Sequence, residues 1–320
     1  MDGSAILVTG GSGYIGQALL PVLGDSAVEV LNLDLRRGHH GRFVPGDIRH
    51  LPAHLPPADT IIHLAGVDDT SAASQADLFA INVEGTRAVL DHAATTHANR
   101  VVLVSSIAVL GPSETPLDEV SPPRPTSAYG RSKLAAERVA SQLAGTAGIQ
   151  LVILRPGYVF GPGHLGNFGR MLGAIRGRRF VLPGRADTIK AGIYLRDVAR
   201  LLAYLATCND PPALVHGVYP DTPTTLAWAD LLARQWGSSP VRVAPQPLVS
   251  AGQAVLGCAA PLHPSLGRLN DRVDKLRHST NVVSRVLPDL PFAFAFTWAQ
   301  AAADLAKSST SAATAVADAP

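Results

Sequence analysis

The first sixteen residues constrain the fold more than any other stretch of the chain. Residues 5–8 (AILV) form a short apolar run, which predicts a strand buried on both faces. A small, glycine-rich turn follows, and from Tyr14 the pattern becomes helical. Glycines stand at Gly10, Gly13 and Gly16. This combination of strand, glycine turn and helix is typical of a dinucleotide-binding motif.

Each of the three glycines has a separate physical purpose in such a motif. Gly10 permits the tight turn, Gly13 lets a pyrophosphate approach the backbone, and Gly16 lets the helix pack close to the strand. The helix N-terminus then offers free N–H groups and a positive dipole end to the phosphates. We therefore expect these glycines, with Tyr14 and Ile15, to bind a dinucleotide cofactor.

Further apolar runs indicate the fold class. They lie at residues 29–33, 42–44, 60–64, 101–104, 151–154, 193–195 and 215–219. Helical patterns at residues 77–94 and 128–147 separate several of them. Strands that alternate with helices predict an α/β fold. We expect a doubly wound parallel sheet of the Rossmann type, with about seven strands.

Beyond residue 160 the chain becomes rich in glycine and arginine, which indicates a second structural unit. We expect a dinucleotide-binding domain at residues 1–160 plus 193–218, a smaller α+β substrate-binding cap at 161–192 plus 219–306, and a disordered tail at 307–320. The tail prediction rests on its small and polar composition. A proline-rich loop at residues 112–125, which carries Glu114, Asp118 and Glu119, is expected to run over the surface.

Composition excludes several functional classes. The net charge of +2 gives no electrostatic case for nucleic acid or for a membrane surface. No apolar run approaches about eighteen residues, and the N-terminus lacks a secretory pattern, so we expect a cytoplasmic protein. Cys208 and Cys258 form no CxxC pair or metal-ligand cluster, so no metal is predicted, although a disulfide between them stays open.

The end of the second predicted strand bears on the choice of cofactor. Asp34 stands about twenty residues after the glycine turn, where a carboxylate accepts hydrogen bonds from ribose hydroxyls. It would repel a 2′-phosphate, so it favours NAD over NADP. Arg36 and Arg37 follow at once and leave NADP open, because guanidinium groups hold phosphates well.

Small and polar residues follow several other strands, at the edge where open α/β sheets bind ligands. Asp47 can reach an adenine or simply cap a turn. We expect a further set of these residues to line the cofactor: Asp47, Ile48, Leu64, Ala65, Gly66 and Ser105.

Tyr129 and Lys133 lie four residues apart in a helical pattern and so share one face. A phenol with its usual pKa of about 10 is a poor acid–base group at neutral pH, but a nearby ammonium lowers that pKa. Alone, such a pair is a common surface feature. Ser106 at the end of a central strand, together with the nucleotide fold, favours a catalytic interpretation.

Together these segments resemble the extended short-chain dehydrogenase/reductase superfamily, in its epimerase/dehydratase branch. The motifs are TGGSGYIG from Thr9, GDI from Gly46, HLAG from His63, NVEGT from Asn82, SSIAVLG from Ser105, YGRSK from Tyr129, RPGYVFGPG from Arg155 and YLRDVA from Tyr194. The resemblance is close over residues 6–199 and loose beyond them.

The resemblance implies roles for individual residues. Ser106, Tyr129 and Lys133 would form the catalytic triad, and Asn82 would support the site from behind. Pro156 and Tyr158 would flank the nicotinamide. Asn167, Arg185 and Lys190 would contact the substrate. Arg268 or Arg272 would be further candidates for an anion contact, although solvated loop charges explain such arginines equally well.

Three departures from the family pattern narrow the reaction. Ile107 and Ala108 stand where 4,6-dehydratases carry an Asp-Glu pair, which argues against dehydration. Leu110 replaces a usual tyrosine. Lys190 replaces an arginine that nucleotide-sugar epimerases present to a diphosphate, and lysine lacks the bidentate fork.

The resemblance implies an NAD-dependent enzyme acting on a secondary alcohol or ketone of a small-molecule substrate. One option is a sugar or nucleotide-sugar 4-epimerase. The other is a net dehydrogenase or reductase of a hydroxysteroid-like, sugar-acid or other carbonyl compound. A non-catalytic redox sensor is a remote alternative, because such proteins usually lose the Tyr or the Lys. The family commonly forms homodimers through the helices predicted at residues 77–94 and 129–147.

Overall fold

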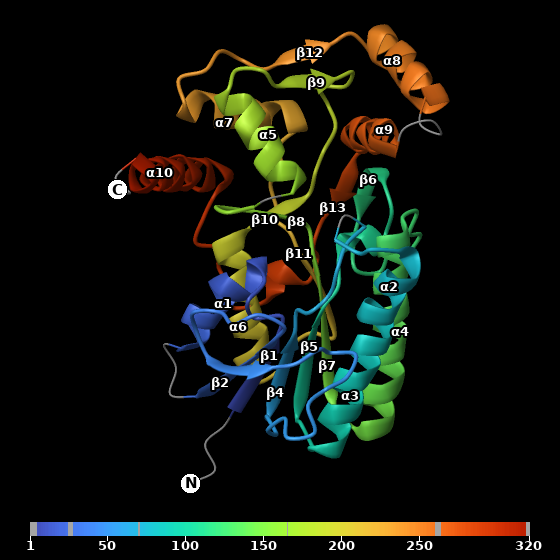
Figure 1. The fold of residues 1–320 in the computed structure, drawn as a ribbon, viewed down its shortest axis with the longest axis vertical. Helices are drawn as coiled ribbons and strands as arrows, with labels where there is room; N and C mark the ends of the chain where they lie inside the picture. Colours follow the sequence, from blue (N-terminus) through green and yellow to red (C-terminus); the bar gives the residue numbers. More distant parts are fainter. Residues whose placement is uncertain (1–4, 25–27, 70, 165, 260–263, 318–320) are drawn as a thin grey trace.

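A computed structural model describes residues 5–24, 28–69, 71–164, 166–259 and 264–317. Its centre is a seven-stranded, all-parallel sheet (Figure 1). In spatial order the strands are β11 (Leu214–Gly217), β7 (Gln150–Pro156), β5 (Arg100–Val104), β4 (Thr60–His63), β1 (Ala5–Thr9), β2 (Glu29–Asp34) and β3 (Arg42–Pro45). The chain order reverses between β1 and β4, the kind of place where doubly wound sheets bind ligands. The predicted fold class is therefore confirmed.

Helices cover both faces of this sheet. Ile6 and Val8 of β1 pack on one face with α1 (Tyr14–Gly24) and α6 (Leu195–Thr207). Ala5 and Leu7 pack on the other face with α3 (Gly85–Thr95) and α4 (Ala128–Ala147). This explains why the strand is apolar throughout instead of alternating.

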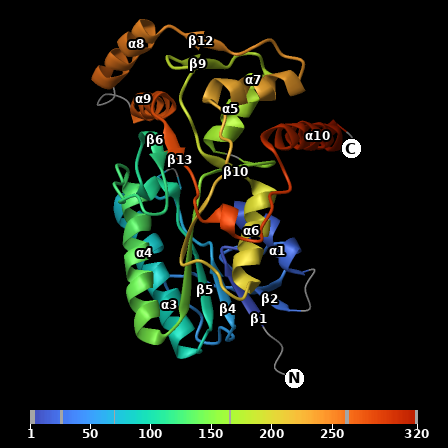
Figure 2. The same cartoon turned by 180° about the vertical axis from the view of Figure 1, so that it is seen from behind.

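The remaining elements lie mainly above the carboxyl ends of the strands (Figures 1 and 2). They are β8 (Tyr158–Phe160), α5 (Asn167–Arg176), β9 (Val181–Pro183), β10 (Gly192–Tyr194), α7 (Thr225–Gln235), β12 (Arg242–Ala244), α8 (Gln246–Ala259), α9 (Pro264–Arg277) and α10 (Trp298–Ala317). An aromatic cluster joins several of them, with Phe160 stacked on Trp298 at 4.9 Å between ring centroids. We refer to this upper unit as the cap.

The helix predicted at residues 77–94 is divided into three pieces. It consists of α2 (Gln75–Phe79), a π-helical turn η1 (Ala80–Glu84) and α3. The π turn contains Asn82, which is 2% exposed. Such turns occur often at functional sites, and helix periodicity alone does not reveal them.

The proline-rich segment predicted as a surface loop also carries a strand. β6 (Ser113–Leu117) pairs in parallel with β13 (Thr280–Val282) from the far end of the chain. The Glu119 carboxylate accepts hydrogen bonds from the backbone N–H groups of His216 and Arg285. Val282 of β13 belongs to the same apolar cluster as Ile107. Ile107 begins the short 3-10 turn η2 (Ile107–Val109). Another such turn, η3 (Leu287–Asp289), follows β13.

The predicted tail differs from the observed structure over most of its length. α10 continues to Ala317, so residues 307–317 are helical, and residues 318–320 lie outside the described part. Alanine is the best helix former, and four alanines lie in residues 312–317, which outweighs the polar character used for the prediction.

Candidate active site

A cavity of about 680 Å³ opens at the carboxyl ends of the strands. Residues predicted to bind the cofactor or to form the catalytic triad line it: Gly10, Gly13, Tyr14, Ile15, Gly16, Asp34, Asp47, Ile48, Leu64, Ala65, Gly66, Ser105, Ser106, Tyr129, Lys133, Pro156 and Tyr158. Segments from along the first half of the chain thus converge on one space. Their shared location supports one extended ligand site.

The glycine turn has the geometry that its sequence predicts. Gly10 adopts a left-handed φ of +72°, and a Cβ there would lie 2.7 Å from the backbone nitrogen of Ala65. A Cβ on Gly16 would lie 2.4 Å from the Cα of Gly11, so the close approach is to the turn. A Cβ on Gly13 would meet only the carbonyl oxygen of Gly10, at 3.1 Å. The side of Gly13 that faces the cavity is therefore open.

Asp34 lies at the end of β2, where its carboxylate is fixed by the backbone. Oδ2 accepts a hydrogen bond from the N–H of Ser12 at 3.0 Å, and Oδ1 accepts one from the N–H of Arg36 at 3.1 Å. Arg36 also lines the cavity, whereas Arg37 is not among the lining residues. The carboxylate is thus held against the glycine turn, in the position that suits ribose hydroxyls.

Ser106, Tyr129 and Lys133 meet at the other end of the cavity. Ser106 precedes η2 and accepts a hydrogen bond from the N–H of Ala108 at 3.1 Å. The Ser106 side chain lies near the Tyr129 hydroxyl and acts on its pKa as a hydrogen-bond partner. Lys133 lies one turn further along α4, and its Nζ donates to the carbonyl oxygen of Val104 at 3.0 Å. Ser127 caps this helix by accepting from the N–H of Gly130 at 3.0 Å.

The pKa of Tyr129 differs from the sequence-based expectation. Burial raises it to about 12, the bond with Ser106 lowers it only in part, and the charges of Asp68 and Asp69 raise it further. Burial also lowers the pKa of Lys133 to about 8, against the charge of Glu137. The expected lowering of the Tyr129 pKa by Lys133 is absent, because the ammonium is directed at the carbonyl oxygen of Val104. Burial therefore determines the direction of the shift.

Asn82 does not line the cavity but ties together two segments that do. Its Nδ2 donates to the carbonyl oxygen of Val67 and to Oγ of Ser132, each at 2.9 Å. Its Oδ1 accepts from the N–H of Val67 at 2.9 Å. The loop after β4 is therefore attached to α4 one residue before Lys133.

Asp68 and His164 are among the lining residues that sequence reasoning missed. The His164 ring packs edge-on to Tyr14, with 4.9 Å between centroids. Burial lowers the pKa of His164, and the charge of Asp68 opposes that change. Both residues lie on loops, and their only sequence signal was that they follow strands ending at the ligand-binding edge.

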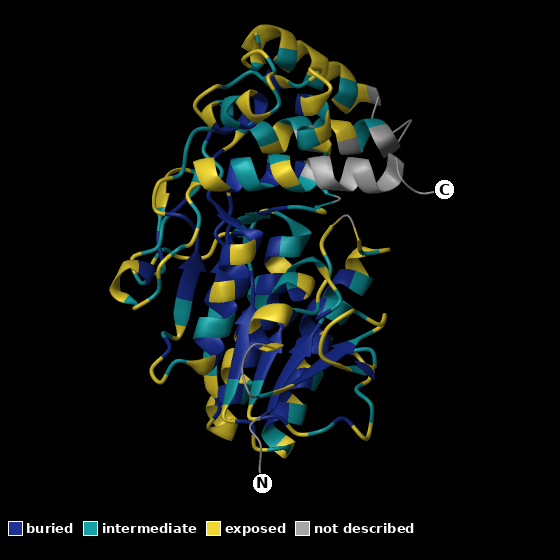
Figure 3. Ribbon diagram, turned by 90° about the vertical axis from the view of Figure 1, so that its left-hand side faces the viewer, coloured by how far each residue is buried: buried dark blue, intermediate teal, exposed yellow. Residues whose placement is uncertain are grey.

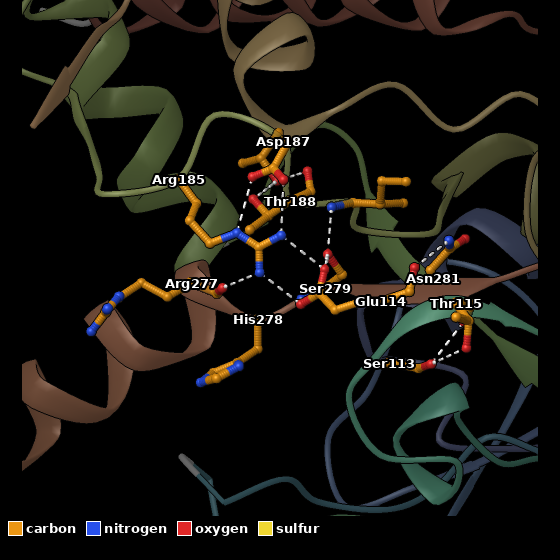
Figure 4. A network of polar contacts seen from close by, with 12 residues as sticks. Ser113, Glu114, Thr115, Arg185, Asp187, Thr188, Arg277, His278, Ser279 and Asn281 are labelled. Atoms are coloured by element: carbon orange, nitrogen blue, oxygen red, sulfur yellow. Dashed lines mark hydrogen bonds and ion pairs between the residues drawn. The ribbon is translucent and has the colours of Figure 1, made fainter. Parts of the chain in front are cut away.

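Two predicted substrate contacts are held by other parts of the protein, as Figure 4 shows for Arg185. Arg185 forms ion pairs with Glu114 at 2.9 Å and with Asp187 at 3.0 Å. The Lys190 ammonium donates to the carbonyl oxygens of Lys275, at 2.6 Å, and His278. Neither residue lines the cavity. The side chains of Asn167, Arg268 and Arg272 lie outside the described part of the structure.

The described residues contain no group of three or more His, Cys, Asp or Glu side chains arranged to hold a metal ion. Within the same residues, no helix combines the length and the apolar character needed to cross a bilayer.

Comparison with known proteins decides the family. The model of the NAD dependent epimerase/dehydratase family matches residues 6–214, which is well over half of the chain. The chain belongs to this family. The epimerase/dehydratase family model covers the entire sheet except the last residues of β11, so the predicted superfamily is confirmed.

Curated relatives resemble this family member over part of their length. The N-acetyl-alpha-D-glucosaminyl-diphospho-ditrans,octacis-undecaprenol 4-epimerase of Escherichia coli O157:H7 is 31% identical over 62% of each chain. The UDP-glucose 4-epimerase of Halalkalibacterium halodurans is 34% identical over 47% of this chain and 49% of its own. The 4-hydroxy-2-methyl-3-oxo-4-farnesyl-3,4-dihydroquinoline-1-oxide ketoreductase of Stigmatella aurantiaca is 33% identical over 54% and 55%. The matched part thus spans about half to three fifths of these relatives.

Solved structures share the fold over a longer stretch. MoeE5 in complex with UDP-glucuronic acid and NAD superimposes with a TM-score of 0.76 at 22% identity, covering 97% of this chain and 100% of MoeE5. The similarity of fold therefore extends over the cap as well as the sheet.

Proposed function

We propose that this chain is an NAD-dependent enzyme that oxidises or reduces a secondary alcohol or ketone through Ser106, Tyr129 and Lys133. The observation that carries the proposal is the single cavity that connects the glycine turn to these three residues. The glycine turn lies at one end of this cavity, and Ser106, Tyr129 and Lys133 lie at the other. A redox sensor would have no need of this second end.

The described residues fit NAD. Gly13 leaves the backbone open to a pyrophosphate, and the N-terminus of α1 offers N–H groups to it. The fixed carboxylate of Asp34 would accept hydrogen bonds from the adenosine ribose, which favours NAD over NADP. Arg36 is the feature that keeps NADP as an outcome to be measured.

Nicotinamide supplies or accepts the hydride when it is bound, and the protein handles the proton. Tyr129 would give its hydroxyl proton to the oxygen of a ketone, or remove the proton from an alcohol. Ser106 would hydrogen-bond the same oxygen and hold it against the phenol. Lys133 would bind the nicotinamide ribose through its ammonium group.

We propose 4-epimerisation of a sugar as the first candidate reaction. The E. coli and H. halodurans relatives are both 4-epimerases by name, which supports this choice. An epimerase returns the hydride to the opposite face of the same carbon, so it regenerates its cofactor in every cycle. Dehydration is not proposed, because Ile107 and Ala108 carry neither an acid nor a base.

A specific observation favours net carbonyl reduction as the second candidate. Lys190, expected to meet a substrate diphosphate, is engaged by two backbone carbonyls, and Arg185 is engaged by two carboxylates. This arrangement suits a substrate without a diphosphate. The relative from S. aurantiaca is a ketoreductase by name, which supports the same alternative. A homodimer and a cytoplasmic location remain predictions.

The first experiment is to denature the purified protein and identify any nucleotide released. Retained NAD in near-equal amount supports the epimerase, whereas empty protein that binds added NAD(H) supports the reductase. Released NADP would refute the role of Asp34, and binding of neither nucleotide would refute the proposed function.

The second experiment replaces Tyr129 with Phe and measures turnover and NAD affinity. We expect turnover to disappear while affinity is retained. Tyr204→Phe, on α6 away from the cavity, is the matched control and should keep full activity. Activity retained in Tyr129→Phe would remove the proton-transfer role.

A further inference from the structure

The end of the cap furthest from the sheet carries an unusual share of exposed apolar side chains. Eight large hydrophobic residues are exposed on the described surface. Five of them belong to adjoining elements of the cap: Val181 in β9, Val243 in β12, Leu248 and Val255 in α8, and Leu269 in α9. Figures 1 and 2 place β9, β12 and α8 at one extremity of the molecule. We call β9, β12, α8 and the adjoining α9 the cap tip.

Helix α8 contributes the largest part of this surface. It contains no charged residue, and the whole run from 243 to 267 has no Asp, Glu, Lys or Arg. Leu248, Ala251, Val255 and Cys258 recur at helical spacing and are all exposed, with Leu248 and Val255 each 69% exposed. Figure 3 shows the exposed residues of this end in yellow. An exposed apolar helix face of this kind normally marks a surface that binds a membrane or another protein.

Exposed arginines gather on one side of the cap tip, where β9 and β12 begin. Arg176, Arg178 and Arg179 precede β9 and are exposed, and exposed Arg242 lies opposite Val181 in the β9–β12 pair. Among the described residues, no ion pair joins these four arginines to a carboxylate. The residues predicted to form the cap, 161–192 and 219–306, include thirteen Lys and Arg against seven Asp and Glu, although the whole chain is nearly neutral.

We infer that the cap tip docks on an anionic lipid bilayer, with the exposed face of α8 in the interfacial region and the arginines on the headgroups. A surface that combines exposed apolar side chains on a helix with nearby basic residues binds anionic membranes through apolar burial and charge together. A second copy of this chain fits less well, because a two-fold contact through the cap tip would bring the same arginine cluster against itself. The inference is independent of the proposed reaction.

The test uses the full chain and vesicles of phosphatidylcholine and phosphatidylglycerol in equal parts, with pure phosphatidylcholine for comparison. We expect co-sedimentation with the anionic vesicles that weakens as salt is added. The pair Leu248→Glu and Val255→Glu should reduce partitioning by at least about tenfold, because it removes two apolar side chains and adds two negative charges next to anionic headgroups. Arg178→Ser and Arg179→Ser should each reduce it about fivefold, which corresponds to about 1 kcal/mol per arginine.

Two measurements protect the test against misfolded variants. Leu248→Trp should strengthen binding while leaving Tm unchanged, because tryptophan favours the bilayer interface. Cys258 lies on the exposed face of α8, so an environment-sensitive fluorophore attached to it in a Cys208→Ser background should shift to the blue with anionic vesicles. Val120→Glu is the matched control, because Val120 is 81% exposed but lies in the loop after β6. It should leave partitioning unchanged.

Several results would overturn the inference. They are absence of binding to anionic vesicles, unchanged binding in the Leu248 and Val255 variant, and an unshifted fluorophore at Cys258. A dimer of the wild-type chain that becomes monomeric in the same variant, measured by sedimentation velocity without lipid, would assign the cap tip to a second copy instead.

Discussion

Glu137 and Arg155 form a bidentate ion pair between α4 and β7. Nε of Arg155 donates to Oε1 at 2.9 Å and Nη2 donates to Oε2 at 2.7 Å, and each side chain is 6% exposed. Glu137 lies one turn beyond Lys133, and its charge opposes the burial that lowers the lysine pKa. The pair therefore fixes the helix that carries Tyr129 and Lys133 to the central sheet.

Glu137→Gln should lower the free energy of unfolding by about 3–5 kcal/mol, because it leaves the Arg155 guanidinium buried without a countercharge. Urea unfolding measures this loss. Glu29→Gln is the matched control, since its pair with Arg42 has side chains 50% and 63% exposed. That change should cost at most about 1 kcal/mol. Equal losses in the two variants would contradict the role given to the buried pair.

Gly13→Ala and Gly16→Ala should separate cofactor binding from folding. A methyl at position 13 meets only the Gly10 carbonyl at 3.1 Å, so the fold should survive, while the pyrophosphate loses its approach to the backbone. We expect NAD affinity to fall about tenfold or more with a small change in Tm. A methyl at position 16 would lie 2.4 Å from backbone, so Tm itself should fall. Unchanged NAD affinity in Gly13→Ala, measured by titration calorimetry, would disprove the proposed pyrophosphate site.

Asn82→Ala should impair turnover more than cofactor binding. Its removal leaves the buried polar groups of Val67 and Ser132 without their partner, at a cost of about 1–3 kcal/mol. The loop that carries Asp68 should then move relative to Lys133, and turnover should fall by up to about a hundredfold. Steady-state kinetics and hydrogen exchange at Val67 measure the two effects. Thr146→Ala, which removes an exposed hydrogen bond on α4, should change neither.

His63 should make the protein less stable in acid. Burial lowers its pKa from 6.5 to about 3, and its ring lies 2.6 Å from Thr9 Oγ1 and 3.0 Å from Thr86 Oγ1. Between pH 6.5 and 3 the unfolded chain binds a proton that the folded chain excludes. Stability should therefore fall as the pH decreases, by at most about 1.4 kcal/mol per pH unit from this group.

The comparison with His63→Gln isolates this contribution. Glutamine keeps donor and acceptor groups but does not titrate, so its unfolding free energy should depend less on pH between 6.5 and 4. Urea titrations of both proteins at several pH values supply the measurement. Parallel curves would show that His63 does not account for the acid sensitivity.

The part of the site that sequence predicts best consists of short local motifs. Gly10, Gly13 and Asp34 are recognisable because a turn, a helix start and a strand end are local in sequence, and each restricts the residue type. Their common location then follows from one topological rule, that parallel strands end at the same edge. For this reason the sheet and the lining of the cavity could both be predicted.

Contacts between distant segments could not be predicted in the same way. Lys190 and Arg185 look like free cations in sequence, but their partners come from α9 and from β6, far away along the chain. The phenol pKa of Tyr129 depends on the degree of burial, which no motif encodes. The basic, apolar cap tip is also hidden in a sequence whose net charge is only +2.

The parallel pairing of β6 with β13 has a consequence for how the protein is made. Ser279, which donates to the Glu114 carboxylate, lies 165 residues downstream of it. At cellular rates of synthesis, roughly ten to thirty seconds separate the emergence of these two residues from the ribosome. The segment after Ser106 therefore waits, without its covering strand, until most of the cap has been translated. A pause in translation within the cap would prolong the life of a chain whose glycine turn and first strands are complete but whose Ser106 end of the cavity is still uncovered.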